Sequence, residues 1–293
     1  MKVIRAKSAG FCWGVERAID IAREYAVQGK RPVFTDGPLI HNSQMMEKLE
    51  SEGIREVGDY MSQSKLELGL SPEEKQQAVM VVRAHGISPN RREYLKNLGM
   101  DFRDATCPDV GIIAGKVKLY ARKGHSTVVF GDPKHPEVMG LMGYTEGRGH
   151  VIKSEKDIDA LPPLGDKVCM VSQSTMFTFE FEHLAEYLKK TYPDAVVFNT
   201  ICGATRERQS DVLVLAQQGA EAIVVIGGRH SANTVKLAAL VEKQHLPCFH
   251  VETVAELDLK QLSKYKIVGV TAGASTPGFL IDEVCEKLSA MDA

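Results

Sequence analysis

Three cysteines recur at equal intervals along this chain of 293 residues. Cys12, Cys107 and Cys202 are each separated by 95 residues. Each one follows a strand-like stretch and precedes a helix-like stretch, in the segments AGFCWGVERAI, DATCPDVGIIAG and NTICGATRERQ. Cysteines that only fill a core have no reason to recur at one period in matching contexts. We therefore expect these three thiolates to act together as ligands.

The number and spacing of these cysteines narrow the kind of group that they could hold. Soft thiolates select zinc, copper(I) or iron–sulfur clusters. A structural zinc site usually has four protein ligands, often paired as in CxxC, and no two of the six cysteines are paired in this way. Three thiolates suit a 4Fe–4S cluster with one iron left open, which could act on a substrate hydroxyl as a Lewis acid and electron donor. We interpret Cys169, Cys248 and Cys285 as buried apolar residues.

Polar loops follow the cysteines at regular distances. The first set lies 28 or 29 residues after each cysteine and contains His41, His135 and His230. The second set lies 39 to 45 residues further on and contains His85, Ser174 with Thr175, and Ser275. Helix N-termini beside such loops favour phosphate, because their N–H groups are unpaired and carry the positive end of the helix dipole. The residues expected to bind a diphosphate are His41, His85, His135, Ser231, Asn233 and Ser275.

Each of these residues, taken alone, is better explained by local capping or by an ordinary loop histidine. The phosphate interpretation rests on their common register. Glu137 lies two residues after His135 in the segment HPEV. Beside an apolar substrate its pKa would rise and it could donate a proton, whereas the alternative is a surface glutamate.

The elements that must position these residues alternate between strand and helix, which predicts an α/β fold with mainly parallel sheets. The expected buried strands are 79–82, 126–130, 168–172, 195–198, 222–227 and 266–273, and the expected amphipathic helices include 44–53, 181–190 and 235–244. The cysteine period divides the chain into three αβ domains, each with three strand-loop-helix steps. The domains are expected at 13–106, 107–201 and 202–293, with residues 1–12 packing against the third.

We expect the three domains to close as a trefoil around a pseudo-threefold axis. Ligands of open α/β sheets bind outside the carboxyl ends of the strands, so one set of loops per domain would then reach a central site.

Composition excludes several other classes of function. The formal net charge is −2, the pI is about 6.5 and only 6% of the residues are aromatic, which disfavours nucleic-acid binding. No apolar run approaches the roughly 18 residues of a membrane span. The first residues, MKVIRAKSAG, lack the apolar core of a signal peptide. We expect a cytoplasmic protein, in which unpaired cysteines serve metal or catalytic roles.

The chain resembles the IspH/LytB family, the 4-hydroxy-3-methylbut-2-enyl diphosphate reductases of the methylerythritol phosphate pathway of isoprenoid synthesis. The stretches that carry the resemblance span residues 9–277 in the order of the family: AGFCWGVERAI, GPLIHN, RAHGISP, DATCP, HPEVMGLMGY, SQST, NTICGATRERQ, SANT and TAGASTP. The resemblance implies a trefoil around one 4Fe–4S cluster, with Cys12, Cys107 and Cys202 as its ligands. It also implies that the diphosphate lies on the six residues named above.

The resemblance further implies that the substrate hydroxyl binds the open iron beside Glu137 and a hydroxyl side chain. The family has a threonine at this last position, where this chain has Ser174, followed by Thr175. The implied reaction is a reductive dehydroxylation to isopentenyl or dimethylallyl diphosphate, supplied with electrons by a ferredoxin- or flavodoxin-type protein. Two alternatives stay open: a related reductase or dehydratase of another hydroxylated substrate, and a non-catalytic protein with a metal site of three cysteines.

Overall fold

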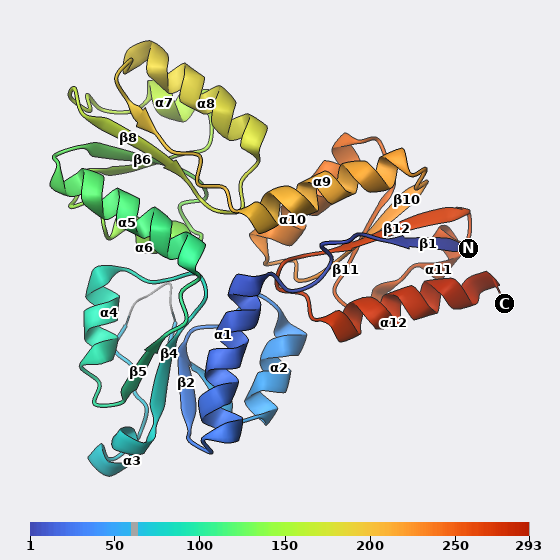
Figure 1. Cartoon of the computed structure of the whole chain (residues 1–293), viewed down its shortest axis with the longest axis horizontal. Helices are drawn as coiled ribbons and strands as arrows, with labels where there is room; N and C mark the ends of the chain where they lie inside the picture. The colour runs from blue at the N-terminus through green and yellow to red at the C-terminus, as the bar shows by residue number, and fades with distance from the viewer. Residues whose placement is uncertain (60–63, 293) are drawn as a thin grey trace. The chain divides into compact units, whose positions relative to one another are not determined.

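The computed structural model describes residues 1–59 and 64–292. These residues form three sheets of four strands, and every strand pairing in them is parallel. The prediction of an α/β fold with parallel sheets is confirmed. Figure 1 shows the three sheets, each with its own helices.

The first sheet has the strand order β3-β2-β4-β5. Its strands are β2 (Val33–Asp36), β3 (Ile54–Val57), β4 (Val79–Val82) and β5 (Asp101–Asp104). The helices of this part of the chain are α1 (Trp13–Arg23), which continues into a π-helical turn at Glu24–Gln28, α2 (Ser43–Ser51), α3 (Pro72–Gln77) and α4 (Pro89–Lys96). The two central strands, β2 and β4, are buried along their whole length, as expected for a parallel sheet that is covered on both faces.

The second sheet has the order β7-β6-β8-β9. Its strands are β6 (Ser126–Phe130), β7 (Gly149–Ile152), β8 (Val168–Ser172) and β9 (Val196–Val197), and its helices are α5 (Pro108–Arg122), α6 (Pro136–Met142), α7 (Glu155–Asp159) and α8 (Thr178–Thr191). Alternate residues of the central strands point to opposite faces. Val129 and Val171 pack with α5 and α6, whereas Val128 and Met170 pack with α8.

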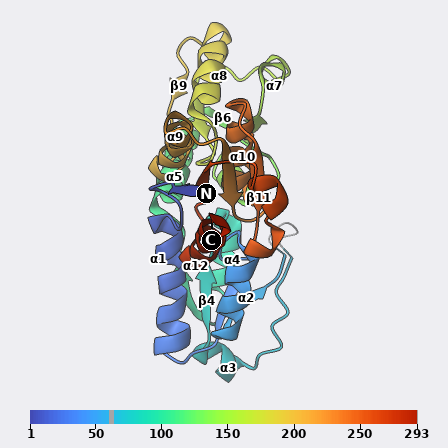
Figure 2. The ribbon, with the colours of Figure 1, turned by 90° about the vertical axis from the view of Figure 1, so that its right-hand side faces the viewer.

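The third sheet joins the two ends of the described chain, in the order β1-β12-β10-β11. Its strands are β1 (Lys2–Arg5), β10 (Ala222–Ile226), β11 (Cys248–Val251) and β12 (Ile267–Ala272). Its helices are α9 (Gly203–Gln217), α10 (Ala232–Lys243), α11 (Leu259–Leu262) and α12 (Gly278–Ser289), with 3₁₀ turns at Val254–Glu256 and Ala290–Asp292. Both views show β1 and α12 side by side, and Met1 and Met291 pack against one core (Figures 1 and 2).

All three sheets have one topology. In each, the strands lie in the order second, first, third, fourth, counted along the repeat. The fourth strand is β5 in the first sheet and β9 in the second. The first strand of the chain, β1, takes the same place in the third sheet, where Lys2 pairs with Ile267. A cysteine turn follows each fourth strand, so the period of 95 residues reflects a real structural repeat.

One strand of each repeat was missed by the sequence analysis. Each sheet has four strands, and the expected scheme of three steps omitted β3, β7 and β11. These are edge strands of four residues with few buried side chains, so they lack the continuous apolar run that marks the central strands. The expected central strands and the three expected helices are present, with ends that differ by up to three residues. The strand expected at 195–198 is shorter, because β9 contains only Val196 and Val197.

The chain divides into two compact units. The first contains Met1–Val15, His41–Glu47 and Cys202–Ala293, and the second contains Glu16–Ile40 and Lys48–Ile201. The third sheet therefore belongs to the first unit, and the other two sheets belong to the second. Two of the four boundaries between the units fall inside α1 and α2, and the other two fall just before His41 and Cys202.

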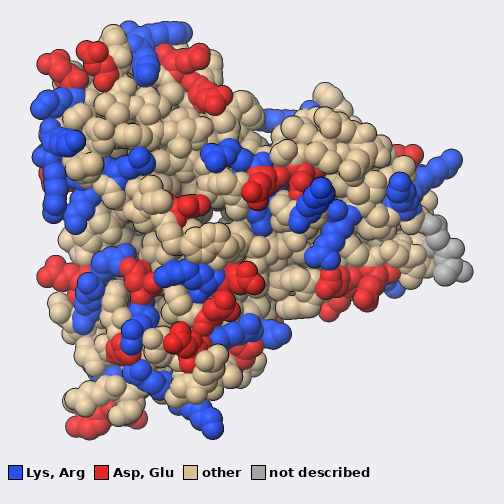
Figure 3. All heavy atoms as spheres, viewed as in Figure 1, with Lys and Arg blue, Asp and Glu red and all other residues tan. Residues whose placement is uncertain are grey.

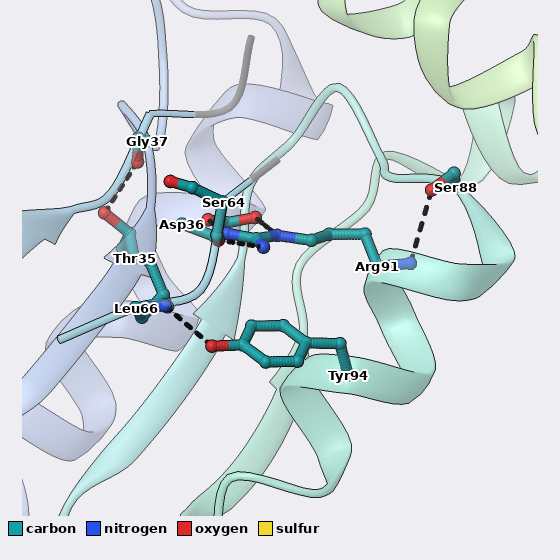
Figure 4. Close-up of polar contacts among 8 residues, drawn as sticks. All are labelled: Thr35, Asp36, Gly37, Ser64, Leu66, Ser88, Arg91 and Tyr94. Atoms are coloured by element: carbon teal, nitrogen blue, oxygen red, sulfur yellow. Dashed lines mark hydrogen bonds and ion pairs between the residues drawn. The ribbon is translucent and has the colours of Figure 1, made fainter. Parts of the chain in front are cut away.

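A buried ion pair fixes the loop after β2. Arg91 of α4 donates from Nε and Nη2 to the two carboxylate oxygens of Asp36, at 2.8 and 2.6 Å, and both side chains are at most 5% exposed (Figure 4). Ser88 caps the start of α4, and the phenol of Tyr94 accepts a hydrogen bond from the N–H of Leu66. The pair thus links the carboxyl end of β2 to the helix that follows β4.

The surface carries both signs of charge. Lys and Arg are interspersed with Asp and Glu over the face in Figure 3, in keeping with the small net charge of −2. No described helix is long and apolar enough to cross a membrane.

Candidate active site

The predicted site residues occupy equivalent places in the three sheets. In each sheet the order of the strands reverses between the first and third strands, and ligands of such sheets bind at the carboxyl ends next to this switch. His41 and His85 follow β2 and β4, and Ser231 and Ser275 follow β10 and β12. In the second sheet, His135 and Glu137 follow β6, and Ser174 and Thr175 follow β8. The common topology therefore explains why these loops carry the polar residues.

Glu137 is buried in the second unit, with 2% of its surface exposed. This excludes the alternative of a surface glutamate. Ser174 donates two hydrogen bonds to its carboxylate, from the backbone N–H to Oε1 and from Oγ to Oε2, both at 2.6 Å. Burial raises the pKa of Glu137 to about 7, although the two hydrogen bonds from Ser174 act to lower it. A carboxyl group with this pKa can hold or release a proton at neutral pH.

His135 positions the helix turn that carries Glu137. It is the N-cap of α6, and its Nδ1 accepts a hydrogen bond from the N–H of Glu137 at 3.2 Å. The ring of His85 meets the ring of His135 edge-on, with the centroids 5.7 Å apart. His85, His135 and Glu137 therefore form one cluster within the second unit.

A cavity of about 360 Å³ lies beside this cluster in the second unit. Its walls include Glu137 in the first turn of α6, His85 in the loop after β4, and Cys107 at the N-cap of α5. Val110 and Leu141 supply apolar surface, and Tyr144 contributes a ring. The cavity thus combines a proton-holding carboxyl group, a predicted metal ligand and an apolar wall.

Thr175 has a different role from its neighbour Ser174. Its Oγ1 accepts a hydrogen bond from Nε2 of Gln173 at 2.8 Å, whereas both polar groups of Ser174 reach Glu137. Gln173 also accepts a hydrogen bond from the N–H of Asp132, in the loop after β6. Gln173 therefore ties together the two loops that carry Glu137 and Ser174.

The first unit brings together the other four residues predicted to bind the diphosphate. Ser275 donates from Oγ to the carbonyl of His41 at 2.9 Å. Ser231 is the N-cap of α10 and its Oγ accepts a hydrogen bond from the N–H of Thr234. Asn233 is 5% exposed, and its amide nitrogen has no hydrogen-bond partner within residues 1–59 and 64–292. A buried amide donor at the start of a helix of twelve residues suits an anionic ligand.

The three repeated cysteines all lie at helix N-termini. Cys12 precedes α1, and Cys107 and Cys202 are the N-caps of α5 and α9. All three are half-buried, and none of them forms a disulfide with another described cysteine. The positive end of a helix dipole favours a thiolate. The remaining three cysteines are poorer candidates for thiolate ligands, because burial raises the pKa of Cys169 and Cys248 to about 11 and also raises that of Cys285.

Several contacts within the second unit fix the turn that carries Cys107. The N–H of Cys107 donates to the carbonyl of Ala84, after β4. Asp104 accepts hydrogen bonds from the N–H and Oγ1 of Thr106 and forms an ion pair with Arg92. Arg17 donates to the carbonyl of Thr106 at 3.2 Å. The thiol therefore stands on a rigid turn, as a metal ligand requires.

The chemistry of these donors fits an iron–sulfur cluster. Three reduced thiols on helix N-termini supply the soft anionic ligands that such clusters take. Among the described residues, no three His, Cys, Asp or Glu side chains come together to hold a single metal ion.

Two residues near the cysteines were not singled out from the sequence. Thr205 lies three residues after Cys202, and its Oγ1 is 3.0 Å from the sulfur, to which its N–H also donates. Arg208 lies one helical turn further on and is 2% exposed. The corresponding positions of the other repeats hold Val15 and Val110, and Ala18 and Ile113. The departure from the threefold pattern is the signal that could have identified Thr205 and Arg208.

Comparison with known proteins assigns the chain to a family. The model of the family described as LytB protein matches residues 3–289. The chain belongs to the LytB family. A relative from Opitutus terrae, named 4-hydroxy-3-methylbut-2-enyl diphosphate reductase, is 65% identical over 99% of this chain and 100% of its own length. A relative of the same name from Alkaliphilus oremlandii is 39% identical over 99% of each chain.

Solved structures of this LytB fold give the same result. The E-1-hydroxy-2-methyl-but-2-enyl-4-diphosphate reductase from Plasmodium falciparum matches with a TM-score of 0.88 and 27% identity, over 98% of this chain and 88% of its own. A structure described as (E)-4-hydroxy-3-methyl-but-2-enyl diphosphate reductase, the terminal enzyme of the non-mevalonate pathway, matches with a TM-score of 0.71 and 32% identity, over 99% of this chain and 100% of its own. The family resemblance seen in the sequence is confirmed.

Proposed function

We propose that this LytB protein is a 4-hydroxy-3-methylbut-2-enyl diphosphate reductase, the enzyme of the last step of the methylerythritol phosphate pathway. The reaction removes the allylic hydroxyl group of the substrate. It consumes two electrons and two protons and yields water with isopentenyl or dimethylallyl diphosphate. Relatives of this name match over the full length of the chain, at up to 65% identity. The buried Glu137, with its pKa of about 7, carries the mechanistic part of the proposal.

We assign Cys12, Cys107 and Cys202 as the ligands of one 4Fe–4S cluster. Their common position after the fourth strand of each repeat supports this assignment. When bound, such a cluster with an open iron supplies single electrons and a Lewis acid for the substrate hydroxyl. The protein must provide the orientation and the protons.

The diphosphate group is assigned to His41, His85, His135, Ser231, Asn233 and Ser275. The buried amide of Asn233 and the start of α10 offer N–H donors to its oxygen atoms. These donors would hold the allyl group in one orientation, which lowers the entropy cost of the reaction.

The hydrogen bonds of Glu137 define which of its oxygen atoms carries the proton. Oε1 accepts a hydrogen bond from the backbone N–H of Ser174. Because a backbone N–H can only donate, Oε1 must remain the acceptor in this contact. The acidic proton therefore belongs on Oε2, where it faces Oγ of Ser174 at 2.6 Å. Oγ can accept this proton and donate its own. Glu137 and Ser174 can thus exchange a proton between Oε2 and Oγ beside the cavity, which Glu137 itself lines, and the serine supplies the hydroxyl group that the threonine of the family would supply.

Two further assignments complete the proposal. Single-electron chemistry needs a protein donor of the ferredoxin or flavodoxin type. A cytoplasmic location fits the six cysteines, which form no disulfide within the described residues, because reducing compartments disfavour disulfides.

The decisive experiment is an anaerobic assay with reduced methyl viologen, the cluster-loaded protein and 4-hydroxy-3-methylbut-2-enyl diphosphate. We expect rapid bleaching and formation of isoprenyl diphosphates. A brown, iron-replete protein that bleaches no viologen would keep the cluster and refute the substrate, leaving the alternative of another hydroxylated substrate. A colourless protein that holds zinc would favour the non-catalytic site of three cysteines.

Cysteine variants test the ligands separately. Cys107→Ser is expected to lose iron on desalting, because a thiolate ligand is removed. Cys169→Ser is the matched control, since this cysteine is buried in strand β8 and its thiol is not a predicted ligand. Equal iron contents in the two variants would contradict the ligand assignment.

A further inference from the structure

A buried arginine stands where the repeat otherwise has an apolar residue. Arg208 lies six residues after Cys202, and the same offset from Cys12 and Cys107 leads to Ala18 and Ile113. Ala18 and Ile113 are apolar residues at 0% and 1% exposure, whereas Arg208 brings a permanent positive charge into the interior at 2% exposure. A position that departs from the pattern of its own repeat at such a cost is expected to have a function.

The guanidinium of Arg208 links two of the cysteine turns within the first unit. Its Nη2 donates to the carbonyl of Gly10 at 2.6 Å, two residues before Cys12. Its Nη1 donates to the carbonyl of Ala204 at 2.8 Å, two residues after Cys202. Gly10 has a φ of +126°, a backbone conformation that favours glycine, and this directs its carbonyl. One side chain therefore holds both turns in register.

The charge of Arg208 has no carboxylate ion pair in the described part of the chain. Burial lowers the pKa of Arg208, and the negative groups that oppose this effect are first the thiolates of Cys12 and Cys202, then Glu207 and Asp211. Asp211 is already occupied, because its Oδ2 accepts hydrogen bonds from the N–H and Oγ of Ser8, each at 2.7 Å. Nε of Arg208 has no hydrogen-bond partner among the described residues. Cys12 and Cys202 therefore become its main counter-charges when they hold a cluster as thiolates.

We propose that Arg208 is a positioning residue of the cluster: it holds the Cys12 and Cys202 turns together, and its positive charge favours the reduced form of the cluster. The inference rests on the proposed function, because it takes these cysteines as cluster ligands. One-electron reduction makes a cluster and its thiolates more negative by one charge. A fixed cation behind two of the thiolates stabilises that added charge, and burial keeps the attraction from being screened by water.

The role of Arg208 also explains why arginine is needed there. A guanidinium remains charged when buried and can donate to two carbonyl groups at once, whereas a lysine ammonium is a point charge on a flexible stem. Arg208→Lys therefore keeps the charge and weakens the link, and Arg208→Gln removes the charge.

The test is a redox titration of the cluster, followed by electron paramagnetic resonance, in the full-length protein loaded with iron and sulfide. At the midpoint potential of the wild type, we expect Arg208→Gln to lower the ratio of reduced to oxidised cluster about tenfold, which is 59 mV for a one-electron couple. Arg206→Gln is the matched control, because it removes the same charge from the exposed face of the same helix. Arg206→Gln is expected to titrate like the wild type.

The outcomes separate this inference from the proposed function. A wild-type protein that takes up no iron and sulfide overturns both. A wild type with a normal cluster, and a midpoint potential in Arg208→Gln equal to that of Arg206→Gln, overturns the inference alone. If Arg208→Gln cannot be loaded with iron and sulfide, Arg208→Lys provides the test instead. A midpoint potential close to that of the wild type supports the role of the charge, and a faster loss of iron supports the link between the two turns. A potential in Arg208→Lys as low as that expected for the neutral variant refutes the role of the charge.

Discussion

The hydroxyl group of Ser174 is predicted to lower the pKa of Glu137, and Ser174→Ala tests this directly. The pKa of about 7 results from burial, which raises it, and from two hydrogen bonds of Ser174, which lower it. The variant removes the Oγ hydrogen bond of 2.6 Å and keeps the backbone hydrogen bond. A hydrogen bond to a charged acceptor is worth about 1.5–3 kcal/mol, and 1.36 kcal/mol corresponds to one pKa unit. The pKa of Glu137 should therefore rise from about 7 to between about 8 and 9.

The sign of the expected pH effect follows from the role of Glu137 as a proton donor. Its protonated form is active, so turnover declines as the pH rises through its pKa. In Ser174→Ala the alkaline limb of the pH profile should therefore move to higher pH by about one to two pH units, which corresponds to the free energy of the lost hydrogen bond. The rate at low pH should also fall, because the variant breaks the proton path from Oε2.

The measurement combines pH–rate profiles with infrared difference spectra of the carboxyl band, using Glu137→Gln to assign the band. Ser172→Ala is the control, because Ser172 lies in the same segment and its hydroxyl donates to the carbonyl of Gln173 instead of to Glu137. An alkaline limb that stays in place, or moves to lower pH, would refute the electrostatic account of this site. A wild-type carboxyl band that titrates near the ordinary glutamate value would refute it as well.

Three further predictions concern other parts of the structure. Glu137→Gln should keep its iron and lose turnover by about 10²–10⁴-fold, as expected for the loss of a general acid, and a fully active variant would contradict the assignment. Thr205→Val should keep the cluster and lower its midpoint potential by less than Arg208→Gln does, because hydrogen bonds to cluster sulfurs tune the potential; an unchanged redox titration would exclude such tuning. Asp36→Asn should destabilise the protein by about 3–5 kcal/mol in urea unfolding, since the buried guanidinium of Arg91 loses its counter-charge, whereas Asp282→Asn, at the exposed pair with Arg5, should cost at most about 1 kcal/mol. Equal losses of unfolding free energy in the two variants would contradict the argument that burial makes the ion pair of Asp36 more important than that of Asp282.

The sequence predicted the parts of the fold that are repeated and buried. Central strands such as 126–130 and 222–227 are continuous apolar runs, and the structure has β6 and β10 there. Edge strands such as β7 and β11 were missed, because their side chains are partly exposed and their pairing depends on a neighbouring strand rather than on their own composition.

The site residues that follow the repeat could be predicted from the sequence, whereas the residues whose role depends on burial in the folded chain could not. The period of 95 residues selected the cysteines without reference to structure. The sequence could not decide whether Glu137 was a surface carboxylate, because its burial comes from segments distant in the chain, including the loop that carries Ser174. Arg208 was missed for the same reason, since an arginine in a polar stretch such as ATRERQ is normally exposed and only the folded structure shows its contact with Gly10.

The pairing of β1 with β12 has a consequence for synthesis of the chain. Lys2 pairs with Ile267, so β1 meets the strand that it pairs with in the described part of the chain only after 265 further residues have been made. At a translation rate of about 5–20 residues per second, this strand waits for between about 13 and 50 s. The first two sheets are complete within residues 33–197 and can form during this interval, whereas the third sheet cannot close until β12 has been made. Cys12 lies in the turn between β1 and α1, and Gly10 of this turn contacts Arg208, so the final place of this turn is also reached only after β12 has been made. Assembly of a cluster on all three cysteines is therefore expected to follow the synthesis of β12.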